Sequence, residues 1–401
     1  MATIHRHAGV MTMNALPPAQ TEVFSALLDD LRLERKPDVR TGEIDTSYYT
    51  DENWFKQEHQ QLFAAAPLVI GHSSMLQKPG DHFVHDHSGK PILVVRGKDD
   101  QIRAFLNVCR HRGVRLSNAD GVANTPSFVC PYHNWIYALD GTLSKVPLQS
   151  ECFPDLDKSC HGLKELPLGE CEGLLFVSGD PDASINLQQQ LGPIQDDFKA
   201  FRLGDHVFFR ESVTTKKANW KLIIEAFLDG YHVVRLHRKT VGPMFLDGVA
   251  KSQRSGDNIM SVVARQEFER ALELDRNEWD LRRHASCAFF LFPNTTIIVH
   301  PDYISYLTLF PTAANETICV HGCLIAEAPR DEKAAAHWER AYNIIEEGVF
   351  QAEDLFVCEQ AQIGMNSGAN DKLLFGSYES SILDFHHIIA EKMGPYTPAS
   401  G

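Results

Sequence analysis

Short apolar runs separated by turn residues fill the middle of the chain, from about Leu68 to Gly179. This pattern is typical of small, loop-rich β-sheets. Residues 91–96 and 101–107 flank the segment Gly97-Lys98-Asp99-Asp100, which favours a turn, and we expect them to form a hairpin. The middle of the chain is therefore predicted to be all-β.

Helical periodicity lies on both sides of this block. Helices are expected at residues 20–34 and 54–66 before it, and at residues 220–237, 331–365 and 380–392 after Pro181. Strand-like runs bounded by Pro, Gly, Asn or Asp lie at residues 207–215, 259–265, 288–292, 295–299, 303–310 and 317–326. Strands together with helices of this length predict an antiparallel sheet packed against helices, which makes the chain α+β as a whole.

Composition narrows the class of protein. The 401 residues are 43% hydrophobic and 23% charged, as in an ordinary globular protein, and the formal net charge of −15 argues against a nucleic-acid partner. We find no apolar run long enough to span a membrane, and Met1–Asn14 lacks the apolar core of a secretory signal. Nine cysteines without a regular framework favour a reducing compartment, so we expect a cytoplasmic protein.

Two short cysteine–histidine motifs carry the clearest chemistry. Cys109-x-His111 and Cys130-x-x-His133 are separated by eighteen residues, and an apolar run precedes each. Two thiolates and two imidazoles are the ligand set of a Rieske [2Fe–2S] cluster, in which two histidines replace two cysteines on one iron. The same set also suits a four-coordinate structural zinc. The spacing alone leaves both interpretations open.

Other clusters of the same residue types favour a structural interpretation. Cys319, His321 and Cys323 alternate along an expected strand and share one of its faces, but no second ligand pair follows them. His82, His85 and His87 alternate in the same way and are expected to decorate a strand or loop. The pair His386-His387 is expected to lie on a helix without a chemical role.

A second metal site is predicted further along the chain. Asp229 and His232 are three residues apart on the expected helix 220–237, and His237 follows five residues later. The two imidazoles reach one ion if the helix loosens near its end. Two histidines and one carboxylate form the facial triad of non-haem Fe(II) enzymes. Asp354 is the preferred carboxylate, with Glu353 and Glu359 as alternatives.

Four segments together resemble one known family. NVCRHRG (Asn107–Gly113) and CPYHNW (Cys130–Trp135) resemble the Rieske motif of the non-haem iron oxygenases. NWKLIIEAFLDGYHVVRLH (Asn219–His237) and EDLFVCEQAQIG (Glu353–Gly364) are similar to the catalytic helix and carboxylate region of the same family.

The departures from the family pattern are informative. Val114 and Tyr132 stand where respiratory Rieske proteins have disulfide cysteines, which points to the oxygenase branch. Asn134 replaces a usual glycine, and asparagine tolerates left-handed backbone better than other non-glycine residues. Ala226 stands where many relatives have asparagine near the iron, which affects only an accessory contact.

The resemblance implies a terminal oxygenase (alpha) component of the aromatic-ring-hydroxylating family. Residues 67–180 would form the all-β Rieske domain, residues 181–401 a helix-grip catalytic domain, and residues 1–66 a helical segment packing on the catalytic domain. The implied ligands are Cys109, His111, Cys130 and His133 for the cluster, and His232, His237 and Asp354 for a mononuclear Fe(II). Asp229 matches the aspartate that bridges the two centres across a subunit interface.

The implied reaction uses O2 and electrons from NAD(P)H to hydroxylate a small, aromatic substrate. The chain has no Gly-rich dinucleotide fingerprint, so a separate reductase, with or without a ferredoxin, is expected to supply the electrons. Alternatives are an oxidative O- or N-demethylase, a quaternary-ammonium monooxygenase, or a Rieske electron carrier without oxygenase activity. A homotrimer, with or without a beta subunit, is implied. At most two or three of six phenylalanines are expected to contact substrate, the rest being core: Phe227, Phe245, Phe289, Phe290, Phe292 and Phe310.

Overall fold

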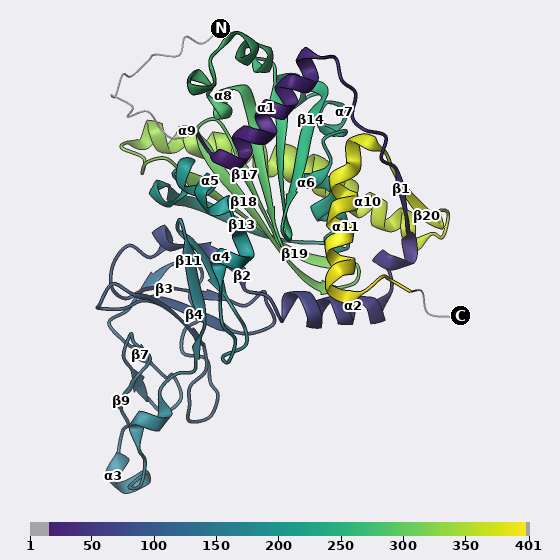
Figure 1. Cartoon of the computed structure of the whole chain (residues 1–401). Helices are drawn as coiled ribbons and strands as arrows, with labels where there is room; N and C mark the ends of the chain where they lie inside the picture. The colour runs from purple at the N-terminus through teal and green to yellow at the C-terminus, as the bar shows by residue number, and fades with distance from the viewer. Residues whose placement is uncertain (1–15, 398–401) are drawn as a thin grey trace.

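The computed structural model describes residues 16–397, and its largest element is a seven-stranded antiparallel sheet (Figure 1). The strand order is β13-β19-β18-β17-β16-β15-β14. The strands are β13 (Val207–Lys216), β14 (Phe245–Ser255), β15 (Asn258–Arg265), β16 (Ala285–Leu291), β17 (Thr295–Val299), β18 (Tyr303–Ala313) and β19 (Glu316–Ile325). All six runs expected in this region are strands. The sequence did not predict β14, because Asp247 and Gly248 and a polar second half obscure its alternation.

The two faces of this sheet pack into different cores. Ile259 and Phe290 belong to the core formed with helices α6 (Trp220–Leu228) and α11 (Ser380–Met393). Their neighbours Met260 and Phe289 point the other way, into the core that includes Phe24 of helix α1 (Pro18–Arg32). Alternate residues of a strand face opposite sides, so one sheet is covered by helices on both faces.

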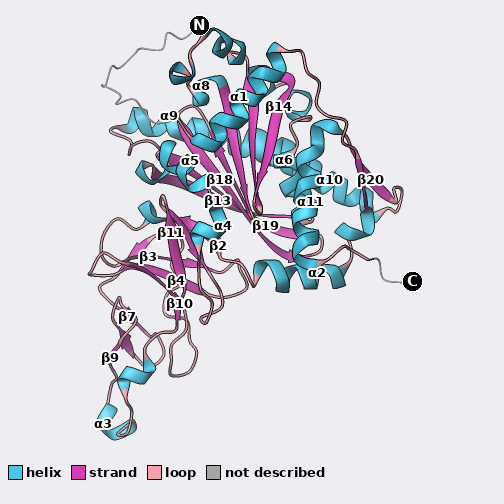
Figure 2. Ribbon diagram, in the orientation of Figure 1, coloured by secondary structure: helices cyan, strands magenta, loops and turns pink. Residues whose placement is uncertain are grey.

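Three smaller sheets form the separate lower part of the molecule (Figure 2). The predicted hairpin of residues 91–107 is present as two paired antiparallel strands. The sheet orders are β10-β5-β4-β3-β6, β11-β12-β2 and β7-β8-β9. Their strands are β2 (Leu68–His72), β3 (Asp81–His85), β4 (Ile92–Arg96), β5 (Ile102–Leu106), β6 (Ala123–Asn124), β7 (Phe128–Val129), β8 (Ile136–Tyr137), β9 (Leu143–Lys145), β10 (Glu165–Leu166), β11 (Leu168–Cys171) and β12 (Leu174–Val177).

The helix expected at residues 220–237 is interrupted, which corrects the prediction. Helix α6 ends at Leu228, Asp229 has extended backbone angles, and a short helix α7 (Val233–Leu236) follows. A side chain at Gly230 would come within 2.9 Å of the Ala250 Cβ on β14, so glycine is required where the chain turns against the sheet. The predicted loosening therefore occurs, but at Asp229 rather than at the end of a continuous helix.

The long helical stretch expected at residues 331–365 is one rod of three parts. Helix α9 (Glu332–Asn343) and helix α10 (Leu355–Asn366) flank η9 (Ile344–Asp354), which is a π-helix. Wide π-helical turns inside α-helices are frequent at functional sites. Asp354 closes this segment and is buried.

The N-terminal elements pack on the large sheet and its helices. Helix α1 contacts β14 and β15, whereas helix α2 (Glu52–Glu58) and the π-helical η2 (His59–Phe63) pack near Trp220 of α6. Strand β1 (Gly42–Asp45) pairs with β20 (Lys372–Phe375). The remaining helices are α3 (Gln149–Cys152), α4 (Leu187–Leu191), α5 (Ile194–Ala200) and α8 (Leu281–His284), with short 3₁₀ turns η1 (Thr46–Tyr49), η3 (Ser73–Met75), η4 (Lys158–His161), η5 (Leu203–Asp205), η6 (Gly242–Met244), η7 (Phe268–Glu273), η8 (Arg276–Glu278) and η10 (Ser377–Glu379).

None of the helices within residues 16–397 combines the length and apolarity needed to cross a membrane. The segment Met1–Asn14, for which no secretory signal was expected, lies outside the described residues.

Candidate metal centres and substrate cavity

The two cysteine–histidine loops share one backbone design. In the first, the Cys109 N–H donates to Val114 O at 2.8 Å, and the Gly113 N–H donates to Cys109 O at 3.0 Å. The second repeats both bonds, with Cys130 N–H to Trp135 O at 2.8 Å and Asn134 N–H to Cys130 O at 3.0 Å. Gly113 (φ 77°) and Asn134 (φ 54°) are both left-handed, as was expected of Asn134.

The thiols point into the small core of this region. Cys109 and Cys130 are buried among the side chains of Phe128, Trp135 and Tyr137. The Tyr137 hydroxyl lies 3.4 Å from Cys109 Sγ and accepts the Arg110 N–H at 2.9 Å. Burial raises the pKa of the Cys130 thiol. A bound cation would offset this effect and favour the Cys130 thiolate, the form that binds metal.

The two imidazoles lie together at the edge of the same core. The rings of His111 and His133 are 4.5 Å apart, and His111 stacks on Trp135 at 4.9 Å. Burial, His133 and Arg112 lower the pKa of His111, which favours its neutral, ligating form. The Nδ1 atoms of both histidines are buried and have no hydrogen-bond partner within the described part of the chain. Buried polar atoms ordinarily have a hydrogen-bond partner, so these two nitrogens are suited to bind a metal instead.

The spacing of the four side chains distinguishes the two groups they could bind, a two-iron cluster or a single zinc ion. The ligands of one tetrahedral zinc lie about 2.0–2.3 Å from the ion, so no two are more than about 4.6 Å apart. Within residues 16–397, no three of Cys109, His111, Cys130 and His133 bring their ligand atoms within 4.8 Å of one another. The four ligand atoms are thus not gathered around one point, an arrangement that suits a two-iron cluster better than a single zinc.

The second site brings together three of the predicted side chains. Suitable ligand atoms of His232, His237 and Asp354 all lie within 4.8 Å of one another. Asp354 Oδ1 is 3.4 Å from His232 Nε2 and 3.2 Å from His237 Nε2. This oxygen is buried and makes no hydrogen bond among the described residues. Two imidazoles and a buried carboxylate that converge in this way fit a divalent transition metal.

Each histidine of this site also has a carboxylate on its other nitrogen. Glu353 Oε2 lies 2.7 Å from His237 Nδ1 and accepts the Thr240 hydroxyl at 2.6 Å. Asp229 Oδ2 lies 3.4 Å from His232 Nδ1, longer than a well-formed hydrogen bond. Outer carboxylates of this kind fix the tautomer and orientation of metal-ligating histidines.

The carboxylates around His232 and His237 favour positive charge at this site. Burial opposes charge on His232, but its contacts with Asp229 and Asp354 outweigh burial and raise its pKa to about 10. Burial likewise opposes the Asp354 carboxylate, and the two histidines nevertheless hold its pKa below the usual value. The alternative ligand Glu359 is elsewhere, accepting the Lys217 N–H at 2.8 Å. Glu353 faces the far side of His237, so Asp354 is the carboxylate that faces both rings.

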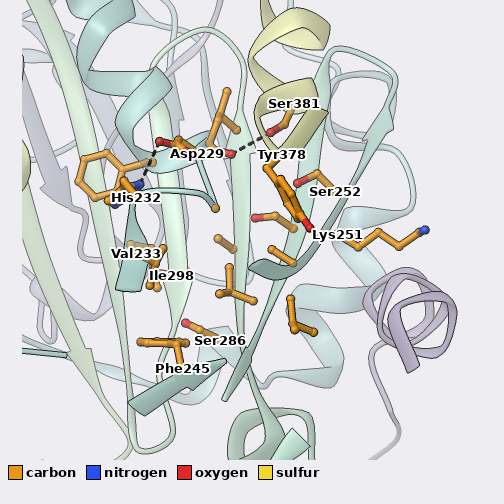
Figure 3. Close-up of a pocket in the computed structure, with 18 of the residues that line it drawn as sticks. Asp229, His232, Val233, Phe245, Lys251, Ser252, Ser286, Ile298, Tyr378 and Ser381 are labelled. Atoms are coloured by element: carbon orange, nitrogen blue, oxygen red, sulfur yellow. Dashed lines mark hydrogen bonds and ion pairs between the residues drawn. The ribbon is translucent and has the colours of Figure 1, made fainter. Parts of the chain in front are cut away.

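A cavity of about 660 Å³ opens beside these residues, between the large sheet and its helices (Figure 3). Val233, Ile298 and Val349 contribute apolar wall, and Ser261, Ser286 and the backbone near Gly248 add polar groups. Figure 3 places Asp229 and His232 at one end of the lining and Phe245 and Ser286 at the other. The site therefore has a metal-facing end and a distant end within one cavity.

Two of the six candidate phenylalanines line this cavity, Phe227 and Phe245. Phe289, Phe290, Phe292 and Phe310 are buried in core packing instead. Phe350 also lines it, packed edge-to-face on Phe227 at 5.1 Å, and was missed. Its position in the π-helical segment gave no signal in the sequence. Ala226 lines the cavity as well, so its methyl group is part of the wall.

The remaining histidines have other contacts. His321 lies 2.7 Å from Glu346 and 3.1 Å from Ser305, so both of its ring nitrogens face protein oxygens. His85 packs against Phe310 at 4.7 Å on strand β3, and His386 lies 2.9 Å from Glu225 on helix α11. The expected strand and helix locations of these residues are confirmed.

Comparison with known proteins matches both parts of the molecule. Residues 66–167 match the Rieske [2Fe-2S] domain, and residues 204–395 match the catalytic domain of the ring hydroxylating alpha subunit. The chain is 29% identical over 368 residues to the carnitine monooxygenase oxygenase subunit of Acinetobacter baumannii, covering 86% of this chain and 93% of that protein. It is 37% identical over 206 residues to biphenyl 2,3-dioxygenase subunit alpha of Rhodococcus jostii, covering 49% and 43%.

Solved structures share the fold across both parts. A quaternary ammonium Rieske monooxygenase in complex with L-carnitine matches with a TM-score of 0.74 at 23% identity, covering 89% of this chain and 97% of that one. Naphthalene 1,2-dioxygenase from Rhodococcus sp. bound to indole matches with a TM-score of 0.72 at 19% identity, covering 96% and 100%.

The chain therefore belongs to the Rieske-type non-haem iron oxygenases, as a terminal component that combines a Rieske domain with a ring-hydroxylating alpha catalytic domain. The predicted family, enzyme class and two-part fold are confirmed. Such a component uses a Rieske [2Fe–2S] cluster, a mononuclear iron and O2, requires a reductase, and acts on a small molecule.

Proposed function

We propose that Cys109, His111, Cys130 and His133 hold the cluster and that His232, His237 and Asp354 hold the mononuclear iron, with Asp229 coupling the two centres. The observation that carries the second assignment is Asp354 Oδ1, a buried oxygen that has no hydrogen bond within residues 16–397 and faces the Nε2 atoms of both histidines. The cluster would supply single electrons and the iron would activate O2 beside the substrate.

The side chains around the iron site have separate tasks in this proposal. Glu353 and Asp229 hold the two imidazoles with Nε2 turned toward Asp354. Phe227 and Phe350 form an apolar wall that excludes bulk water from the metal end. The cavity leaves room for a drug-sized substrate next to the ligands.

The working unit we propose is a ring of subunits, most simply a trimer. Within one chain, the loops beside β7 and the catalytic cavity lie in different parts of the molecule (Figure 1). Asp229 lies beside the exposed side chains of Tyr231 and Tyr378, a surface that a neighbouring subunit can cover. A reductase, with or without a ferredoxin and a beta subunit, completes the system, which we assign to the NAD(P)H-containing cytoplasm.

The substrate we propose is a small organic molecule with an aromatic or aliphatic body, which the cavity walls favour. Hydroxylation of an aromatic ring is one reaction, by mono- or cis-dihydroxylation. Oxidation of a quaternary ammonium compound is the second, because the carnitine monooxygenase subunit matches 86% of this chain, whereas the biphenyl dioxygenase subunit matches 49%. Aromatic side chains such as Phe227 and Phe350 suit both, through ring packing or cation–π contact.

The domain division we propose follows from these assignments. Residues 67–180 carry the cluster ligands, residues 181–401 carry the iron ligands, and residues 1–66 belong with the catalytic part. The packing of α1 on β14 and β15 supports the last point.

The test is EPR of the dithionite-reduced protein with iron and acid-labile sulfide counted on the same sample. We expect a Rieske-type signal and about three irons and two sulfides per chain. Asp354→Ala should lose about one iron and keep the signal, whereas Glu359→Gln, a carboxylate change on the adjoining helix α10, should lose neither. Bound zinc and no EPR signal in the wild type would overturn the cluster assignment. Loss of iron in Glu359→Gln but not in Asp354→Ala would show that Glu359, not Asp354, is the carboxylate ligand.

A further inference from the structure

Four cationic side chains line the catalytic cavity, and three of them are paired with carboxylates. Arg40 lies 2.7 Å from Asp384, and Arg35 and Lys251 both contact Asp30, at 3.6 and 2.5 Å. The fourth is Arg265, which has no carboxylate oxygen within 4.0 Å among residues 16–397. Its recorded polar contact is with Met244 Sδ at 3.8 Å, a weak acceptor.

Arg265 is half-buried, at the last position of strand β15. Its guanidinium lies 5.4 Å from the ring centre of Phe245, the residue opposite it on β14. Two acidic groups lie in the same region without pairing with Arg265: Glu267 contacts Arg283 at 2.6 Å, and Asp302, which also lines the cavity, lies 4.0 Å from His337. An arginine stays protonated under all ordinary conditions, so the cavity wall holds a partly desolvated charge that makes no direct ion pair among the described residues.

The position of this charge matters for the substrate. Figure 3 shows Phe245 and Ser286 at the end of the lining away from His232, with Val233 and Ile298 between them. Because Arg265 is the strand partner of Phe245, it belongs to that distant end. The Ser286 hydroxyl adds a second hydrogen-bond donor there. The cavity therefore runs from a metal end, past apolar wall, to a cationic end.

We propose that Arg265 binds a carboxylate of the substrate, so that the substrate is a small organic acid whose apolar or cationic part reaches the metal end. The planar guanidinium matches a carboxylate with two parallel hydrogen bonds. A monoanion suits the one lining cation that has no direct ion pair, whereas a phosphate dianion would bring an excess of negative charge into a partly buried site that Asp302 also lines. This inference rests on the proposed function, because it names the substrate class of the same cavity.

The competing interpretation is structural, with Arg265 placed only to pack on Phe245. A packing role predicts no preference between a charged acid and a neutral molecule of the same shape. The binding preference for an acid over its primary amide therefore separates the two interpretations.

The experiment measures calorimetric affinities of the full-length holoprotein for benzoate, 3-phenylpropionate and γ-butyrobetaine, each against its own primary amide. We expect at least one acid to bind the wild type tenfold or more tightly than its amide. Arg265→Gln should weaken that acid about ten- to a hundredfold and leave the amide within about twofold, removing the preference. Arg265→Lys keeps the charge but loses the two parallel N–H donors of the guanidinium, so it should retain part of the acid preference.

Arg254→Gln is the matched control. It removes the same charge from the neighbouring strand β14, where Arg254 pairs with Glu391 outside the cavity lining, and it should keep the acid preference. The proposal is overturned if the wild type binds every acid and its amide equally, or if Arg265→Gln keeps the preference. Should Arg265→Gln not fold, Arg265→Lys decides the question, and full retention of the wild-type acid preference in that variant would overturn the proposed two-bond contact with the carboxylate.

Product analysis on the same samples separates this inference from the proposed function. With O2 and a reductant supplied, an Arg265-dependent acid preference without hydroxylated product from any acid supports the carboxylate site and counts against the proposed metal-ligand assignments. Equal turnover and equal binding of acid and amide supports the oxygenase and overturns the carboxylate site.

Discussion

Glu353 and Asp354 are adjacent in the chain, yet they face opposite nitrogens of the same imidazole ring. Glu353 Oε2 lies 2.7 Å from His237 Nδ1, and Asp354 Oδ1 lies 3.2 Å from His237 Nε2. Both residues close the π-helical segment η9, where the wider turn changes the direction in which successive side chains project. The local backbone thus lets one helix supply both a metal-facing carboxylate and the group that orients the histidine.

Glu353→Gln should weaken iron binding while leaving the fold intact. Glutamine can still accept a hydrogen bond from His237 Nδ1, but it removes the charge that makes Nε2 more basic. We expect iron affinity to fall about ten- to a hundredfold, measured by retention against a competing chelator. Glu359→Gln on helix α10 is the control, and unchanged iron retention in Glu353→Gln would show that the contact has no role in metal binding.

The sequence predicted both ligand loops and six of seven large-sheet strands because these depend on local patterns. Cysteine and histidine spacing, apolar alternation and turn residues are all readable over a few positions. Asn134 is the clearest case: its left-handed backbone (φ 54°) was expected from the residue type and the loop alone.

The features that were missed depend on contacts between distant segments. Helix α6 ends at Leu228 because the chain must turn against β14, where Gly230 approaches Ala250. Periodicity continues through this break, so it predicts one helix. Phe350 lines the cavity from the π-helical segment, and no local sequence pattern predicts that segment. Tertiary packing decides both features.

Glu58→Gln should strongly destabilise the fold. The Glu58 carboxylate lies 2.6 Å from Lys221 Nζ and accepts the Trp220 indole N–H at 2.9 Å, with both charged side chains essentially buried. Removing one partner leaves a buried ammonium without its counter-ion, which costs about 3–5 kcal/mol of unfolding free energy. Chemical denaturation monitored by circular dichroism measures the change.

The control for this pair is Glu43→Gln. Glu43 contacts Lys372 at 2.7 Å, but both side chains are more than half exposed, so its loss should change stability little. A change in Glu58→Gln no larger than that of Glu43→Gln would contradict the prediction. Replacing Glu58 and Lys221 together with apolar residues should recover part of the loss.

Asp197 should make the fold less stable as pH rises from about 4 to about 6. Burial raises its pKa to about 6, despite the backbone N–H groups of Ala19 and Gln20 on Oδ1, and its Oδ2 has no partner among the described residues. The folded state therefore holds the proton more tightly than the unfolded state. That contribution is complete below the unfolded pKa and is lost as pH rises through the folded pKa.

Asp197→Asn tests the direction of this pH dependence of stability directly. The amide keeps an acceptor for the N–H groups of Ala19 and Gln20 without the buried charge, so the variant should be more stable than the wild type at pH 7 by up to about 3 kcal/mol. At pH 4 the two proteins should differ little. A variant that is less stable at pH 7 would show that the charge itself stabilises the start of helix α1.

Asp229→Asn should uncouple the two metal centres without emptying either. Asp229 lies 3.4 Å from His232 Nδ1 and caps the end of helix α6, beside the exposed Tyr231. Asparagine keeps the size and an acceptor but removes the charge that we assign to coupling across a subunit interface. We expect unchanged iron and sulfide content, an unchanged Rieske EPR signal, and at least tenfold less product per reduced cluster in a single turnover. Asp247→Asn, which removes a nearby carboxylate paired with Arg235 at 2.7 Å, should leave that yield intact. If Asp229→Asn gave the wild-type yield, the bridging role would be wrong and Asp229 would serve only to orient His232.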